Sequence, residues 1–149
     1  MDEIKRLREK TGAGVMDAKR ALEEASGDMT KAEEIIRQKG LAKAEKKAGR
    51  ETKEGLVYAY VHHDGRSGAM VELQCETDFV ARSDAFKDLA KELAMQVVSM
   101  EPKDTEEFLG QEYIRDPQLT VKDVIAAVVG KVGENIKLKR FVRLGLGEE

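Results

Sequence analysis

The sequence predicts an α+β protein, with a three-helix bundle over residues 1–40 and a small antiparallel sheet covered by helices over residues 55–149. Apolar residues recur at helical spacing in the first forty residues. Two segments of alternating polarity then flank a turn signal, and two longer amphipathic segments follow. Residues 41–54 are rich in Lys, Ala and Glu and lack an apolar pattern, so we expect them to link the bundle to the core domain.

The bundle is expected to contain three short helices. Ile4 and Leu7 share one face of the first helix, which the glycines of Thr11-Gly-Ala-Gly14 end. The second helix ends at Ser26-Gly27, and its apolar stripe consists of Val15, Ala18, Leu22 and Ala25. Each helix is close to or below the roughly 12–15 residues needed for stability in isolation, so the three must pack together.

The third helix has two candidate N-caps. Either Asp28 caps it, or Thr30 does so in a capping box with Glu33 three residues later. Gly40 is expected to end this helix.

The core domain is expected to begin with a β-hairpin. Residues 56–62 and 69–75 read as strands, and Asp64-Gly65 between them is a strong turn signal. A third strand is predicted over residues 136–144. In residues 101–118 the apolar residues follow neither helical nor strand spacing. Either this segment holds a short helix, or a longer connection has been trimmed there.

Two amphipathic helices are expected to cover this sheet. The first is capped by Ser83 or Asp84 and ends before Pro102; its apolar face consists of Phe86, Leu89, Ala90, Leu93, Ala94 and Val97. The second begins at Thr120 in a capping box with Asp123 and ends at Gly133.

Composition narrows the function classes. A chain of 149 residues holds one moderate core, or a core and a small satellite domain, which excludes a large multidomain enzyme. The net charge of -3 gives no electrostatic case for direct nucleic-acid binding, and the lack of Trp argues against a base-stacking surface. The single cysteine fits a reducing compartment, and because the sequence has no long apolar run we expect neither a signal peptide nor a transmembrane helix. We therefore expect a cytoplasmic protein without membrane contact.

Three motifs carry the functional information. In Leu73-Gln-Cys-Glu-Thr-Asp-Phe-Val-Ala-Arg82, a strand delivers Asp78 and Phe79 onto a short turn, which Thr77 and Asp78 can close by hydrogen bonds to the backbone. The Phe79 ring then either folds into the core or is offered to a partner.

The other two motifs lie near the two ends of the chain. Leu7-Arg-Glu-Lys-Thr-Gly-Ala-Gly-Val-Met-Asp-Ala-Lys-Arg-Ala-Leu22 is a helix-turn-helix segment of the bundle; Val15 and Met16 cannot both face its core, so one of them is expected near the surface beside Arg8. Lys131-Val-Gly-Glu-Asn-Ile136 is the end of a helix followed by a basic strand.

In this order, the three motifs resemble the signatures of the elongation factor Ts family, the guanine-nucleotide exchange factors of elongation factor Tu. The resemblance implies that the chain binds elongation factor Tu and promotes GDP release during translation elongation. It also implies a ubiquitin-associated-like fold for the bundle. The contacts that it implies with elongation factor Tu are Thr77, Asp78, Phe79, Val80, Arg8, Val15, Met16, Val132 and Gly133.

The chain departs from the family pattern in two ways. Longer family members carry a projecting helical hairpin, and some carry a second copy of the core, whereas this chain has one core copy and only the connection at residues 101–118. One core copy offers half of the usual contact surface, so the resemblance implies a homodimer.

Enzymatic function is not indicated, and we expect neither a cofactor nor a metal. Cys75 has no adjacent base and lies on the apolar side of a strand, which is typical of an inert buried thiol. His62 and His63 are expected to point to opposite faces of a strand end and so cannot form a metal pair. No P-loop or dinucleotide fingerprint is present.

Two other functions remain open at this point. A ubiquitin-associated-like interaction adaptor would need only residues 1–40. An RNA-associated module would use the basic strand from Lys137 to Arg143 together with basic residues of the linker, namely Lys43, Lys46, Lys47, Arg50 and Lys53. The glutamates interleaved with these residues and the lack of stacking aromatics speak against it.

Overall fold

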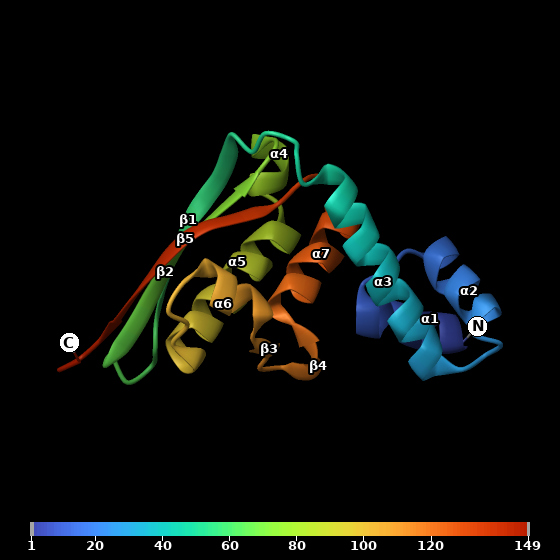
Figure 1. Cartoon of the computed structure of the whole chain (residues 1–149), viewed down its shortest axis with the longest axis horizontal. Helices are drawn as coiled ribbons and strands as arrows, with labels where there is room; N and C mark the ends of the chain where they lie inside the picture. Colours follow the sequence, from blue (N-terminus) through green and yellow to red (C-terminus); the bar gives the residue numbers. More distant parts are fainter. Residues whose placement is uncertain (1, 149) are drawn as a thin grey trace.

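A computed structural model describes residues 2–148 and has the predicted α+β class (Figure 1). The N-terminal helices are α1 (Asp2–Thr11), α2 (Val15–Glu24) and α3 (Met29–Lys47). They enclose a small core of their own, made of Leu7, Ala18, Ala21, Leu22, Ala25 and Ala32. The small alanine side chains allow the helices to approach closely, and this packing compensates for the low individual stability of the ten-residue helices α1 and α2.

Helix α3 has one of the two predicted N-caps but differs from the prediction at its end. Asp28 is the N-cap and accepts a hydrogen bond from the Lys31 backbone N–H, whereas Thr30 lies inside the helix. The helix also continues past Gly40 to Lys47, so the expected stop at Gly40 is wrong. A glycine inside a helix costs roughly 1 kcal/mol, and packing of α3 against helix α7 (Val121–Val132) offsets this cost.

The sheet contains β1 (Glu54–Val61), β2 (Ser67–Cys75) and β5 (Lys137–Gly145) in the antiparallel order β1-β2-β5. The predicted hairpin and third strand are thus confirmed, with shifts of one or two residues at their ends. A β-bulge shifts the pairing of β2 with β5 between Glu72 and Leu73. Figure 1 shows the helices of the core domain on one side of this sheet, so its other face is left open.

Helix α5 (Asp84–Met100) packs against all three strands of the sheet. Ser83 is its N-cap, and all six residues of the predicted apolar face are buried. Helix α7 begins with the predicted capping box of Thr120 and Asp123 and ends at Gly133, whose φ of 77° lies in the left-handed region that glycine tolerates.

The connection between α5 and α7 is ordered. It contains α6 (Thr105–Gly110) and a two-stranded ribbon of β3 (Glu112–Tyr113) and β4 (Asp116–Thr120). Gln96 of α5 holds the ribbon, because its buried amide donates to the Glu112 carbonyl at 2.9 Å and accepts from the Ile114 N–H at 3.1 Å. The short helix was one of the two expected alternatives, whereas the ribbon was not predicted.

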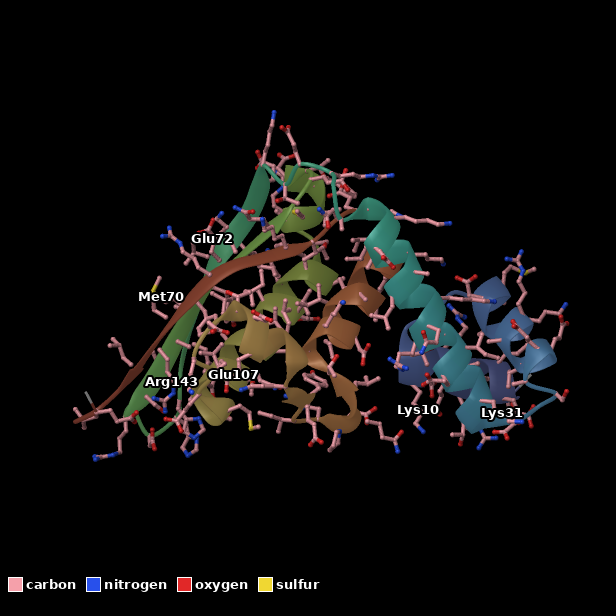
Figure 2. All side chains as sticks on the ribbon, viewed as in Figure 1. Lys10, Lys31, Met70, Glu72, Glu107 and Arg143 are labelled. Atoms are coloured by element: carbon pink, nitrogen blue, oxygen red, sulfur yellow. The ribbon has the colours of Figure 1, made fainter. Side chains whose placement is uncertain are left out.

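The open face of the sheet carries several exposed apolar side chains. Ala59, Met70 and Val142 form one row across the three strands, and Val61, Gly68 and Leu144 form the next. Figure 2 shows Met70 pointing away from the helices on this face. Among residues 2–148, no helix has the length and apolar character needed to cross a membrane.

Candidate protein-binding surface

Phe79 is the most exposed large apolar side chain of the central motif. Strand β2 ends at Cys75, and the short helix α4 (Asp78–Ala81) begins directly after its N-cap, Thr77. The Thr77 hydroxyl accepts a hydrogen bond from the Val80 N–H at 3.3 Å, which closes the turn. Phe79 is 78% exposed, so the structure shows the displayed alternative for this ring and not the buried one.

The residues beside Phe79 have different surroundings. Val80 and Ala81 are buried and join the main core, so Val80 supports the turn from beneath and lies outside the exposed surface. Asp78 is exposed and pairs with Arg82, with 3.3 Å between the Asp78 Oδ2 and Arg82 Nη2 atoms. An exposed pair of this kind contributes at most about 1 kcal/mol, so Asp78 can exchange it for another polar partner.

The end of α7 lies against this turn. The Glu134 carboxylate accepts hydrogen bonds from the N–H groups of Glu76 and Thr77 and from the Thr77 hydroxyl. Gly133 is exposed, and Val132 is half-buried against the core. The structure therefore brings the predicted rim residues of the third motif beside the Phe79 turn.

A second exposed apolar surface lies on the bundle. Val15 and Met16 form the first turn of α2 and are 49% and 56% exposed, so both lie at the surface where only one was expected. The reason is that Ala18, Ala21 and Leu22 fill the inner face of α2. Arg8 lies near them and donates from Nε to the Ala13 carbonyl at 3.3 Å.

These two surfaces are separate. Figure 1 shows α1 and α2 at one end of the molecule and α4 beside the start of β1, with the length of α3 between them. The sequence-predicted contacts therefore fall into a turn surface (Thr77, Asp78, Phe79, Val132 and Gly133) and a bundle surface (Arg8, Val15 and Met16). Sequence reasoning missed Glu134, Glu76 and Asn135, which connect the turn to its surroundings.

The cysteine and histidines do not form a reactive site. Burial and the nearby Glu134 charge raise the pKa of Cys75 to about 11, so its thiol is protonated at neutral pH. The rings of His62 and His63 lie with their centroids 4.3 Å apart, so the expectation that they point to opposite faces is wrong. Strand β1 ends at Val61, and the alternation of a strand does not extend to them. Within residues 2–148, no group of three or more His, Cys, Asp or Glu side chains is arranged to hold a metal ion.

Two exposed apolar surfaces are typical of a protein that acts by binding another protein. Comparison with known proteins gives the family. Residues 76–149 match the family model of elongation factor Ts. The chain is 45% identical to elongation factor Ts of Fervidobacterium nodosum, over 97% of this chain and 96% of that protein. It therefore belongs to the elongation factor Ts family of translation elongation factors.

Two further relatives differ in length. Elongation factor Ts of Thermotoga maritima is 46% identical over 99% of this chain and 96% of the relative. That of Aquifex aeolicus is 51% identical over 96% of this chain but only 51% of the relative. The alignment with the Thermotoga protein is 191 residues long and this chain has 149, so that relative carries residues without a counterpart here.

Proposed function

We propose that this chain is a guanine-nucleotide exchange factor that binds elongation factor Tu and promotes the release of GDP. The observation that carries the proposal is the exposure of Phe79 on a turn that is fixed to the core beneath it. A large aromatic ring costs free energy when left in water, and its display on a rigid turn is typical of an interface anchor.

The exchange follows from linkage between two binding equilibria. If this chain binds the nucleotide-free form of its partner more tightly than the GDP-bound form, it weakens GDP binding by the same factor. Nucleotide sites of this class depend on Mg2+ and on backbone N–H groups directed at the phosphates. We propose that Phe79 inserts between partner helices near the metal end of that site, while Asp78 engages polar groups of the partner. The chain forms no covalent bond and needs no cofactor, so it acts on a GTPase without being an enzyme.

The bundle surface is proposed as the second contact with elongation factor Tu. Arg8, Val15 and Met16 would bind its nucleotide-binding domain, while Val132 and Gly133 form the rim of the contact around Phe79. Thr77 and Val80 contribute by holding the turn, Thr77 as the N-cap and Val80 from the core side. Two separate contacts allow the factor to hold its partner at one surface while the other displaces elements of the nucleotide site.

We also propose a homodimer formed through the sheet. The open face carries an apolar surface built from neighbouring rows of the three strands, consisting of Val57, Ala59, Val61, Met70, Val142 and Leu144. Strands β1 and β5 are the edges of this sheet. A second copy of the chain supplies a surface of matching apolar character, and its own single core copy would complete the contact surface for the partner.

The remaining expectations belong to the same proposal. We place the protein in the cytoplasm, with no direct contact to nucleic acid or membrane. Several basic residues that an RNA-associated module would use are paired with carboxylates: Lys43 with Asp17, Arg50 with Glu76 and Lys53 with Glu51. This pairing reduces the positive charge offered to phosphates and favours the exchange function. A bundle-only adaptor would bind its partner independently of Phe79.

A release assay tests the proposal. Elongation factor Tu is loaded with fluorescent GDP, and the loss of fluorescence is followed after addition of excess unlabelled GDP, with and without this chain. We expect the release rate to rise with the concentration of the chain until it saturates. An unchanged release rate at saturating concentrations of the chain would overturn the exchange function.

A further inference from the structure

The structure assigns to Glu134 the role of a positioning residue for Phe79. The assignment deepens the proposed exchange function. Only its expected effect on GDP release rests on that function, because the hydrogen bonds that hold the turn do not depend on it. Glu134 lies between α7 and β5, while Phe79 lies between β2 and α5, so two distant parts of the sequence meet here.

The Glu134 carboxylate makes three hydrogen bonds to the turn. Its Oε1 atom accepts from the Thr77 N–H at 3.0 Å and from the Glu76 N–H at 3.1 Å. Its Oε2 atom accepts from the Thr77 hydroxyl at 2.7 Å. Hydrogen bonds to a charged acceptor are roughly twice as strong as neutral ones, so this carboxylate is the main polar attachment of the turn that leads into α4.

The contact is reciprocal. The Glu76 carboxylate accepts from the Asn135 N–H at 2.6 Å, so each of the two segments supplies one carboxylate to the backbone of the other. Asn135 is buried, and its side-chain amide donates to the Arg50 carbonyl at 2.8 Å and to the Ala48 carbonyl at 3.3 Å. The end of α3, the Phe79 turn and the end of α7 are thereby joined in one network.

This network explains how so short a helix can present an aromatic ring in a fixed orientation. Helix α4 has four residues, which is too few for stability of its own. Its N-cap hydroxyl accepts from the Val80 N–H while it donates to Glu134, so the carboxylate orients the hydroxyl toward the helix. Loss of Glu134 would free the N-cap and allow Phe79 to sample several orientations. An anchor that must be ordered on binding gives a weaker complex than one that is already fixed.

The mobility of the turn can be measured without any partner. The chain contains no tryptophan, so Phe79→Trp introduces a single fluorescent probe at the anchor position. We expect time-resolved anisotropy to show little fast local motion of this probe when Glu134 is present, and clearly more in the Glu134→Ala background. Glu106→Ala, which changes an exposed glutamate on α6, is the matched control and should leave the anisotropy decay unchanged.

Two further variants keep this measurement decisive. Glu134→Gln retains the oxygen that can accept both backbone N–H groups, so it should restore most of the restricted motion. Glu134→Asp retains the charge but is one methylene shorter, and it replaces the alanine variant if that variant does not fold. An anisotropy decay that is the same with Glu134 and with its alanine or aspartate variant would overturn the assignment.

A double-mutant cycle tests the consequence for exchange. We expect Phe79→Ala to slow stimulated GDP release roughly 30-fold and Glu134→Ala roughly 10-fold. Because Glu134 acts through the ring, the double variant should be no slower than Phe79→Ala alone. Additive losses would show that Glu134 does not act through Phe79 and would overturn its positioning role in exchange. If the parent chain stimulates no release, the exchange function fails, whereas the anisotropy measurement still decides how Glu134 holds the turn.

Discussion

Phe79 is the residue for which a single substitution should have the largest effect on function. Its ring is mostly exposed, so Phe79→Ala should leave the thermal unfolding temperature nearly unchanged. The same change should remove most of the stimulated GDP release, at a cost of roughly 2 kcal/mol or more in the interaction with the partner. Ile114→Ala is the matched control, because Ile114 is an exposed apolar residue on the β3–β4 ribbon. Early melting, or full exchange activity, would show that Phe79 is not an interface anchor.

Arg8 should contribute less than Phe79. Its side chain is exposed and makes one hydrogen bond, to the Ala13 carbonyl at the turn before α2. An exposed charge at the edge of an interface is worth about 1 kcal/mol or less, so Arg8→Ala should weaken the complex by a factor of a few. Titration calorimetry with nucleotide-free elongation factor Tu measures this change. Arg6→Ala, another exposed arginine of α1, provides the control, and parent-like affinity of Arg8→Ala would remove Arg8 from the interface.

At the scale of the element, Asp123 stabilises the N-terminus of helix α7 and also binds α3. Its Oδ2 atom accepts from the Thr120 N–H at 2.9 Å, and its Oδ1 atom accepts from the Arg37 Nη1 group at 3.1 Å. Since Asp123 is buried, both contacts are shielded from water. The bundle is thus attached to the core domain by a charge pair in addition to the packing of α3 on α7.

Asp123→Ala should therefore destabilise the protein by about 1–3 kcal/mol, the cost of losing its capping-box hydrogen bond to the Thr120 N–H together with the charge-assisted hydrogen bond to Arg37. Urea unfolding measures the change in the free energy of unfolding. Asp123→Asn keeps an oxygen for the Thr120 N–H and should lose less, while Lys122→Ala alters an exposed neighbour on the same helix and should have little effect. A stability for Asp123→Ala equal to that of the Lys122→Ala control would contradict this account.

At the scale of the whole molecule, the prediction is a non-covalent homodimer. The open sheet face is apolar in the two rows nearest the β1–β2 turn, and the only cysteine, Cys75, is buried, so no disulfide between copies is expected. Light scattering at micromolar concentration under reducing conditions should give twice the chain mass of 16.6 kDa.

One substitution on the open face makes this prediction specific. Met70→Glu places a charge in the middle of the apolar rows, between Ala59 and Val142, and should convert the dimer to a monomer. Lys87→Glu, at an exposed position of α5 on the other side of the sheet, is the control. A monomeric mass for the parent chain together with full exchange activity would show that one core copy is sufficient for function.

Much of the fold could be predicted because it depends on contacts that are local in the sequence. The caps at Ser83 and Thr120 involve residues three positions apart, and the apolar face of α5 follows from helical spacing. The hairpin of β1 and β2 follows from strand alternation around Asp64-Gly65. The motif with Asp78 and Phe79 was likewise recognisable as a turn from its residue types.

Other features depended on the tertiary structure. Helix α3 continues through Gly40 because α7 packs against it, and β3 and β4 are ordered because Gln96 of α5 holds them. The exposure of Phe79 was one of two alternatives until the positions of Val80 and the core were known. Glu134 contacts Thr77 across 57 positions of the sequence, so no local pattern indicates that partner. The spacing of apolar residues in a helix or strand predicts contacts only between residues a few positions apart. Contacts between distant residues depend on how the whole chain packs.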